Sequence, residues 1–341
     1  MNLPQGGYDI LLERGLLARA GALLGLDRPG RRTLIVTDDG VPAQYAAALA
    51  AQCAAPQLVC VAQGEGSKSF ATLQRLLAAM LQSGFGRADA AVAVGGGVVG
   101  DLTGFAAACY MRGIPFYNLP TTSLAQIDSS IGGKTAINFE GVKNVVGAFY
   151  QPARVLVDPD LLATLPPRQL AAGFAEAIKA GVLADEALLA LFERGQPEAH
   201  LEEILLRSLT FKKNIVEQDE RESGLRRILN FGHTIGHGIE SACGLGGLLH
   251  GECVGLGMLP MCTDPALRAR LTAILELNHL PTRVHFDPDA VYAAACHDKK
   301  GGAGKTAVIE VAAVGRPQIT TIDNSALRTR IEREAREGIG A

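Results

Sequence analysis

Tryptophan is absent from this 341-residue chain, and aromatic residues make up only 5% of it. So few aromatic rings disfavour a surface on which nucleic acid bases stack. An excess of one charge is also lacking, because 32 basic and 35 acidic residues leave a formal net charge of −3. Without a broad basic field, binding to the phosphates of a nucleic acid is not expected. The composition points to a globular protein that has no nucleic acid partner.

Long apolar runs and paired cysteines are also missing. No apolar run reaches the roughly 20 residues that a membrane-spanning helix needs, and residues 1–7 do not look like a signal peptide. The seven cysteines include no Cys-x-x-Cys pair, their number is odd, and they lie among apolar residues. Reduced, buried thiols are typical of cytosolic proteins. We therefore expect a cytoplasmic protein with no membrane partner.

Short apolar segments alternate with helical stretches in the first half of the chain. Strands are predicted at 33–38, 58–64, 90–94, 116–119 and 154–157, with helices at 41–55 and 70–84. Apolar strands separated by helices indicate a parallel sheet that is covered on both faces. We expect an α/β fold whose first domain, residues 1–158, is a doubly wound, Rossmann-like domain.

From about Pro159 the pattern becomes mainly helical. Helices are predicted at 168–182, 186–195, 200–217, 226–241, 251–259, 264–277 and 287–297, and a strand at 306–312. Nearly half of the residues are hydrophobic, which is enough for two cores of ordinary size. We expect a second, mainly α-helical domain over residues 159–341.

The stretch 226–240 combines two histidines with unusual neighbours. As one helix of 3.6 residues per turn, it would place Arg226, Asn230, His233 and His237 on one face. A solvated face usually carries Lys, Glu, Gln and Ser instead. The three glycines of the stretch weaken a helix by about 1 kcal/mol each, which makes sense if another group approaches the backbone closely. Histidines at positions i and i+4 lie on one face of a helix, so both imidazoles can contact the same bound group.

One more histidine and one carboxylate extend this pattern. His250 follows the stretch, and Glu176 precedes it inside an apolar helical segment. An acidic residue in such a segment commonly lies at the solvated edge of the helix. Together, however, one carboxylate and two histidines with an open coordination position describe a catalytic zinc-type site. Zinc and cobalt suit these ligands equally.

The turn from Gly95 to Asp101 follows a predicted strand, opens a helix and contains the Gly-x-Gly-x-x-Gly spacing. Glycines there permit a tight turn and let a pyrophosphate reach backbone N–H groups at a helix N-terminus. Glycine-rich turns also merely connect elements, so the strand and helix around this one matter. Residues 64–68 follow the preceding strand, at the same carboxyl edge of the sheet, although a capped surface loop is the alternative.

The segment 120–138 is the densest polar stretch of the chain. Asp128 lies at an otherwise apolar helix start, and Lys134 follows two glycines; such residues are rarely buried unless they are paired. A capped surface loop is the alternative. Further cations, Lys212 among them and Lys299 and Lys300 near the C-terminus, suggest an anionic substrate with a carboxylate, a phosphate or both. Solvation alone would equally explain the Lys299–Lys300 pair.

Taken together, these motifs resemble 3-dehydroquinate synthase in order and spacing. The matching segments are 95–101, 120–135, 147–152, 175–179, 219–226, 229–237 and 250–252. The resemblance covers roughly residues 30–300 and is most specific over 95–260. It implies an enzyme of the shikimate pathway that converts 3-deoxy-D-arabino-heptulosonate 7-phosphate to 3-dehydroquinate and phosphate. In the implied reaction C5 is oxidised transiently, phosphate is eliminated, C5 is reduced again, and an intramolecular aldol step closes the ring.

The resemblance also implies a set of site residues, two cofactors and a homodimer. The implied ligands of a divalent metal, zinc or cobalt, are Glu176, His233 and His250. The implied NAD contacts are Asp38, Glu65, Lys68, Gly95, Gly96, Gly97, Asp101, Thr121, Thr122, Lys143 and Thr164. The implied catalytic and substrate-contacting residues are Arg112, Asp128, Lys134, Asn144, Lys179, Lys212, Glu222, Arg226, Asn230 and His237, with one of Lys299 and Lys300.

Three other functions share parts of this pattern. Another sugar phosphate cyclase would use a different phosphate, but Asp128 and Lys134 favour dehydroquinate synthase. A metal-dependent polyol dehydrogenase shares the glycine turn, but the many cations argue against it. A non-catalytic nucleotide- or metal-binding protein would not need Glu176 and the histidines.

Three features depart from the family pattern. Gly40 stands where the family often has Asn, Val142 stands where Gly is usual, and the segment after Met258 is shortened. None of them affects the implied metal ligands.

Overall fold

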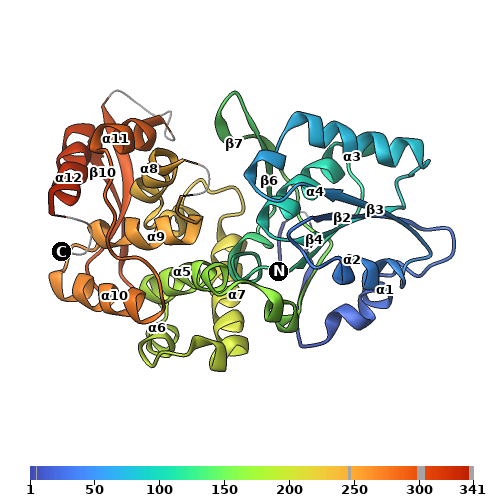
Figure 1. Cartoon of the computed structure of the whole chain (residues 1–341), viewed down its shortest axis with the longest axis horizontal. Coiled ribbons are helices and arrows are strands. Elements are labelled where there is room, and N and C mark those ends of the chain that lie inside the picture. Colours follow the sequence, from blue (N-terminus) through green and yellow to red (C-terminus); the bar gives the residue numbers. More distant parts are fainter. Residues whose placement is uncertain (5, 245–246, 298–303, 338–341) are drawn as a thin grey trace. The chain divides into compact units, whose positions relative to one another are not determined.

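The computed structural model describes the chain except for residue 5 and residues 245–246, 298–303 and 338–341 (Figure 1). Lys299 and Lys300 therefore lie outside the described residues. The chain divides into two compact units, Met1–Leu165 and Pro166–Ala341. In the parts that the structure describes, no helix has the length and apolar character needed to cross a membrane. The predicted α/β fold class is confirmed.

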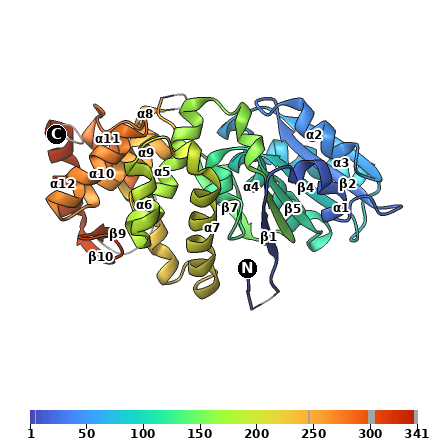
Figure 2. The same ribbon diagram turned by 90° about the horizontal axis from the view of Figure 1, so that it is seen from below.

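A six-stranded parallel sheet forms the centre of the first unit, with strand order β1-β8-β5-β4-β2-β3 (Figure 2). Its strands are β1 (Asp9–Leu12), β2 (Arg32–Asp38), β3 (Ala55–Val61), β4 (Ala90–Gly95), β5 (Phe116–Pro120) and β8 (Arg154–Val157). The five predicted strands are all present. The edge strand β1 was not predicted, because it has only four residues and none of them is fully buried.

Helices cover both faces of this sheet, as predicted (Figure 1). Leu34 and Val36 of β2 pack with α3 (Phe70–Gln82) and α4 (Gly97–Cys109) on one face. Ile35, between them, packs with α1 (Ala20–Leu23) and α2 (Ala43–Ala50) on the other face. Successive side chains of a strand point to opposite faces, so a run of apolar residues fills two cores. Each such side chain contributes roughly 1.5–3 kcal/mol when it is fully buried.

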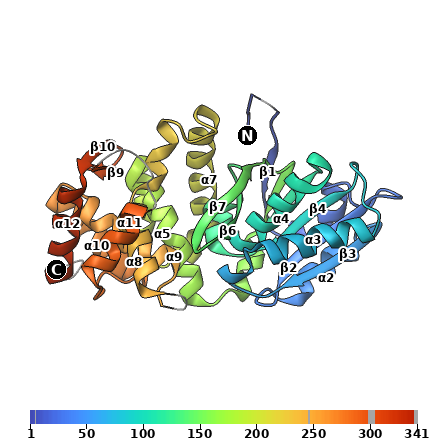
Figure 3. The ribbon, with the colours of Figure 1, turned by 90° about the horizontal axis from the view of Figure 1, so that it is seen from above.

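An antiparallel hairpin of β6 (Lys134–Phe139) and β7 (Val142–Phe149) follows β5 and was not predicted (Figure 3). Its glycines and polar residues hide the alternation of a strand. Ile137 nevertheless packs into the core beside α4. Asp128 lies before the hairpin in a π-helical turn, η4 (Ala125–Ser129). The remaining short helices of this unit are η1 (Leu16–Arg19), η2 (Glu65–Ser67), η3 (Tyr110–Arg112) and η5 (Pro159–Thr164).

The second unit is mainly helical, with one small antiparallel hairpin. Its helices are α5 (Pro167–Ala184), α6 (Glu186–Glu193), α7 (Leu201–Gln218), α8 (His233–Cys243), α9 (His250–Met258), α10 (Pro265–Leu277), α11 (Pro288–His297) and α12 (Asn324–Glu337). Short helices η6 (Pro197–His200), η7 (Leu225–Asn230) and η8 (Leu259–Met261) connect them, and β9 (Lys305–Val311) pairs with β10 (Pro317–Asp323). Helix α5 packs against α6, α7 and α9 (Figure 2). Strand β10 and helix α12 were not predicted.

The predicted helix 226–241 is wrong in its first part. Residues Leu225–Asn230 form the 3-10 helix η7, and α8 begins only at His233. Between them Gly232 has a φ of 81°, a conformation that residues with a Cβ rarely adopt. Arg226 and Asn230 therefore do not share a helix face with His233 and His237.

The glycines of α8 and α9 do allow a close approach, as expected, and the approaching group is another helix. A Cβ on Gly236 of α8 would lie 2.7 Å from the carbonyl oxygen of Cys253 in α9. A Cβ on Gly251 of α9 would lie 1.8 Å from the carbonyl oxygen of Ala172 in α5. These glycines bring α8, α9 and α5 together, and these three helices carry the predicted metal ligands.

All seven cysteines are free. Cys253 and Cys262 are buried, as expected, and burial raises the pKa of the Cys262 thiol to about 12. The expectation of burial is wrong for Cys60 and Cys109, which are exposed.

Candidate active site

Glu176 lies in the buried middle of α5, with only 2% of its side chain exposed. Lys179, one turn further along the helix, forms an ion pair with it. Among the described residues, no group donates a hydrogen bond of good geometry to either carboxylate oxygen. Burial opposes ionisation of this carboxyl group, but Lys179, His250 and His233 together outweigh it and hold the pKa of Glu176 well below its usual value. The site therefore contains a buried anion with unused lone pairs.

Two histidines face this carboxylate. The Nε2 atoms of His233 and His250 each lie 3.7 Å from Oε1 of Glu176. That distance is too long for a hydrogen bond. It is close to the roughly 3.4 Å that separates two N or O ligands of one tetrahedral zinc ion. The spacing fits three groups that share one cation.

The other ring nitrogen of each histidine is already bonded. His233 Nδ1 lies 3.1 Å from the carbonyl oxygen of Phe231, and His250 Nδ1 lies 3.2 Å from Oε2 of Glu240. A carbonyl oxygen only accepts, so His233 donates from Nδ1 and keeps its Nε2 lone pair on the side of Glu176. Burial, reinforced by the charge of Lys179, holds the pKa of His233 well below its usual value. A neutral imidazole with a free Nε2 suits a metal ligand.

His250 differs in charge from His233. Burial favours its neutral form, but the carboxylates of Glu176 and Glu240 outweigh this effect and raise its pKa to about 9. A proton on His250 and a divalent cation would each compensate the negative charge of Glu176 and Glu240. The donor set therefore fits a divalent cation in the place of that proton.

His237 belongs to the same cluster. Its ring centroid lies 5.1 Å from that of His233 and 5.5 Å from that of His250. The three histidines also offer nitrogen atoms that all lie within 4.8 Å of one another. The arrangement thus brings together four predicted residues: the three implied ligands and the histidine one turn after His233.

The turn before η7 holds the next group of predicted residues. Asp219 accepts hydrogen bonds from the backbone N–H groups of Ser223, Gly224 and Arg226, at 2.7–3.0 Å. Arg226 is 2% exposed despite its charge, and Asn230 donates to Glu222 Oε1 at 2.6 Å. Lys212 of α7 is also buried. Asp219, which organises this turn, was not among the predicted site residues.

In the first unit, the glycine turn has the predicted strand–turn–helix setting. Strand β4 ends at Gly95 and α4 begins at Gly97. A Cβ on Gly97 would lie 2.9 Å from Ser129 Oγ, and one on Gly96 would lie 3.0 Å from Thr122 Cγ2. The glycines are thus packed against neighbouring side chains, one of which, Thr122, is itself a predicted NAD contact.

Several residues implied by the resemblance form one polar cluster beside this turn. Lys68 is 4% exposed and lies 2.6 Å from Asp101 Oδ2 and 3.7 Å from Glu65 Oε1. It also donates a hydrogen bond to Asn144 Oδ1. Asn144 comes from the hairpin that was not predicted, so its closeness to Lys68 was not expected. Glu65, Lys68 and Asp101 were implied as NAD contacts and Asn144 as a substrate contact.

The other implied residues of this unit lie in different settings. Asp38 ends β2 and accepts a hydrogen bond from Gly40 N at 2.9 Å, while burial raises its pKa. Thr164 bonds to the Tyr45 hydroxyl at 3.0 Å. Asp128 is only partly buried, and Lys134 is exposed. Thr121 and Thr122 directly follow β5, whereas Arg112 and Lys143 are exposed.

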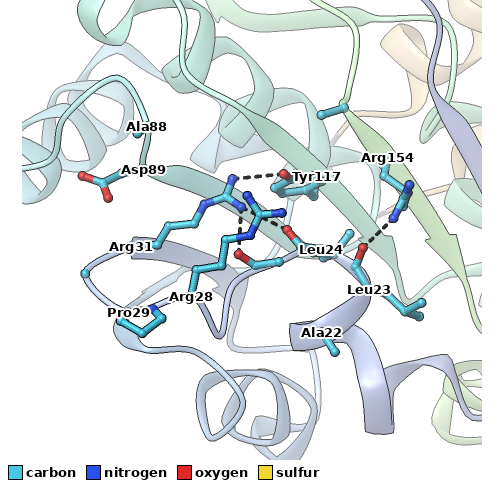
Figure 4. A pocket seen from close by; sticks show the side chains of 13 residues that line it. Ala22, Leu23, Leu24, Arg28, Pro29, Arg31, Ala88, Asp89, Tyr117 and Arg154 are labelled. Carbon is cyan, nitrogen blue, oxygen red and sulfur yellow. Dashed lines mark hydrogen bonds between the residues drawn. The ribbon is translucent and has the colours of Figure 1, made fainter.

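A cavity of about 820 Å³ lies elsewhere in the first unit (Figure 4). Its lining includes Arg28, Arg31, Tyr117 and Arg154, near the amino ends of β2, β5 and β8. The glycine turn is at the opposite, carboxyl edge of the same sheet. Of the predicted site residues that the structure describes, none lines this cavity.

Residues 58–172 match the family model of the 3-dehydroquinate synthase N-terminal domain, and residues 173–301 match that of its C-terminal domain. A 3-dehydroquinate synthase from Enterococcus faecalis (strain ATCC 47077 / OG1RF) is 41% identical over 351 aligned residues, which cover 98% of each chain.

Two solved structures show the same fold. One is 2-deoxy-scyllo-inosose synthase complexed with carbaglucose-6-phosphate, NAD+ and Co2+, with a TM-score of 0.87, 28% identity and 96% of each chain covered. The other is ValA, the 2-epi-5-epi-valiolone synthase from Streptomyces hygroscopicus subsp. jinggangensis 5008, with NAD+ and Zn2+ bound. It has a TM-score of 0.84 and 30% identity, and 98% of this chain and 99% of that chain are covered. With two matching family models and a relative 41% identical over 98% of its length, this chain belongs to the 3-dehydroquinate synthase family.

Proposed function

We propose that this chain converts 3-deoxy-D-arabino-heptulosonate 7-phosphate to 3-dehydroquinate and phosphate, as a carbon–oxygen lyase that uses NAD and a divalent metal. Membership of the family supports the activity. The observation that carries the assignment is the buried Glu176 carboxylate with two histidine Nε2 atoms 3.7 Å from it. The cyclases with a similar structure that are described above bind NAD+ together with Co2+ or Zn2+.

Glu176, His233 and His250 would hold the metal. Once bound, such a cation acts as a Lewis acid that polarises a substrate oxygen. Glu176 supplies the negative charge, since Lys179 keeps it ionised. His237 lies in the same cluster and would hold or move a proton beside the reacting carbons. Its place one turn after His233 lets it face the substrate without being a ligand.

Cationic side chains of the second unit would bind the anionic groups of the substrate. Lys179, Lys212 and Arg226 are all buried, and buried cations are stabilised by anions that they meet with good geometry. Arg226 is suited to bidentate recognition of a carboxylate or phosphate. Glu222 and Asn230 are bonded to each other and would orient the polar groups around them.

We assign NAD to the first unit and the metal to the second. The glycine turn opens α4, whose N-terminal N–H groups would receive the pyrophosphate. The proposed NAD contacts stay Asp38, Glu65, Lys68, Gly95, Gly96, Gly97, Asp101, Thr121, Thr122, Lys143 and Thr164. Arg112, Asp128, Lys134 and Asn144 are proposed to contact the substrate. We also propose that the protein is a homodimer and that it is located in the cytoplasm.

The alternative functions are less well supported. The other cyclases named above share 28% and 30% identity with this chain, against 41% for the dehydroquinate synthase. Both family models describe dehydroquinate synthase domains. No observation of the site favours a polyol dehydrogenase.

The product of the reaction tests this proposal. The protein is incubated with the heptulosonate phosphate, NAD and Co2+ or Zn2+, and phosphate and 3-dehydroquinate are assayed together. Equal amounts of the two products are expected, because elimination and ring closure occur in one turnover. Phosphate without dehydroquinate, or neither product, would contradict the proposal. A Glu176→Gln variant serves as the inactive control.

A further inference from the structure

Glu240 lies on the same face of α8 as the histidine pair. It follows His233 by seven residues and His237 by three, and these spacings return to one side of a helix. Its Oε2 atom lies 3.2 Å from Nδ1 of His250 in α9, and 19% of its side chain is exposed. Glu240 thus connects α8 to the ring of His250 on the side away from Glu176.

The two histidines proposed as metal ligands are held differently. His233 Nδ1 is bonded to the backbone carbonyl of Phe231, two residues earlier in the same segment. His250 Nδ1 is bonded to a side chain that belongs to another helix. Replacing a side chain can remove the second contact but not the first. The orientation of His250 therefore depends on Glu240 in a way that has no counterpart at His233.

The backbone of His250 is fixed independently of Glu240. Leu249 N donates to Glu252 Oε2 at 2.7 Å, which caps the first turn of α9. Glu252 is in turn held by two hydrogen bonds from Arg168, at 2.7 and 2.8 Å. With the backbone fixed, the remaining freedom of His250 is rotation of its side chain. The contact with Glu240 restricts that rotation and directs Nε2 toward Glu176.

We propose that Glu240 is a positioning residue that orients His250 as a ligand of the divalent cation. This inference rests on the proposed metal site. A carboxylate that accepts the Nδ1–H of a ligating histidine fixes its tautomer and makes Nε2 a better donor, and loss of such a partner typically costs 10–100-fold in metal affinity. Glu240 itself would not touch the cation or the substrate.

Metal affinity, measured without substrate, tests the proposal. The full-length protein is stripped with a chelator and titrated with Co2+ or Zn2+ in competition with a chromogenic chelator. Glu240→Ala is expected to weaken binding 10–100-fold. Glu240→Gln should lose much less, because its amide oxygen accepts the same hydrogen bond. The visible spectrum of bound Co2+ should change in Glu240→Ala and stay near that of the wild type in Glu240→Gln.

Glu217→Ala is the matched control. Glu217 is also a helical glutamate whose side chain is 19% exposed, and it pairs with Lys213 in α7. Its loss should leave the metal affinity unchanged. A Glu240→Ala affinity within twofold of the wild type, in protein with native circular dichroism, would overturn the inference alone. A wild-type protein that binds neither ion would contradict the proposed function, and the inference with it.

Discussion

His250 Nε2 and Glu176 Oε1 lie 3.7 Å apart, and no group in the part of the chain that the structure describes donates a hydrogen bond to that carboxylate oxygen. The two residues come from α9 and α5, and the glycine contact between Gly251 and Ala172 brings those helices together. Lys179 pairs with Oε2 of Glu176, whereas Oε1 meets two imidazole nitrogens without a hydrogen bond, and a cation shared by these three atoms would complete the arrangement.

Removal of Glu176 should remove the metal. Glu176→Gln keeps the shape of the side chain but loses the charge that offsets the cation. We expect the metal content, measured by elemental analysis after dialysis, to fall from about one ion per chain to near zero. His250→Ala should give the same result. Full metal content in either variant would show that the ligands have been assigned wrongly.

His237→Ala should separate metal binding from catalysis. His237 lies beside the other two histidines but is not among the proposed ligands. The variant should keep its ion, because Glu176, His233 and His250 remain. It should lose most of its rate, because general acid–base groups contribute about 10²–10⁴-fold. Elemental analysis and kcat are measured on the same preparation, and loss of the ion would make His237 a ligand.

Asp219 should stabilise the protein in a pH-dependent way. Burial opposes its ionisation, but hydrogen bonds from the backbone of Gly224, Arg226 and Ser223 outweigh this effect and lower its pKa. The stabilisation is therefore present above its unfolded pKa of about 3.9 and is lost as the pH falls through the lower pKa of the folded state. The urea midpoints of wild type and Asp219→Asn should differ at pH 7 and converge as the pH falls through the lowered pKa of the folded state. A constant difference would contradict this role.

Gly251→Ala should destabilise the second unit. The added methyl would lie 1.8 Å from the carbonyl oxygen of Ala172, so α9 and α5 would have to separate. Overpacking of this kind costs about 1–3 kcal/mol. Gly255→Ala in the same helix is the control, because its methyl would meet Leu275 at 3.4 Å and alanine favours a helix. Chemical denaturation should show a loss for the first variant and none for the second.

The strands of the first unit could be predicted because their residues are buried on both faces. Ile35 and its neighbours in β2 are apolar regardless of which face they point to. The hairpin of β6 and β7 could not be predicted in the same way, because its strands are partly exposed and interrupted by glycine and polar residues. Consequently, the contact of Asn144 with Lys68, 76 residues apart, was not foreseen.

The metal cluster could be predicted from residue types, but its geometry could not. The helical period continues through Gly232, so the pattern gave no sign of the positive φ that ends η7 and separates Arg226 from α8. Glu240 was missed although its spacing from His233 and His237 places it on their helix face. That spacing was the signal that would have found it. Asp219 accepts hydrogen bonds from backbone N–H groups. Such contacts cannot be recognised from residue types in a sequence.

The fate of the hydride tests the central claim most directly. Phosphate release and absorbance at the NADH wavelength are recorded together, with the heptulosonate phosphate in large excess over a trace of NAD. If the hydride returns to the carbon that it left, each NAD supports many turnovers, so phosphate should accumulate while the absorbance does not rise steadily. Protein stripped of NAD should release no phosphate, because the proton next to C5 is not acidic until C5 is a ketone. Stoichiometric accumulation of NADH, or phosphate release from NAD-free protein, would contradict the account.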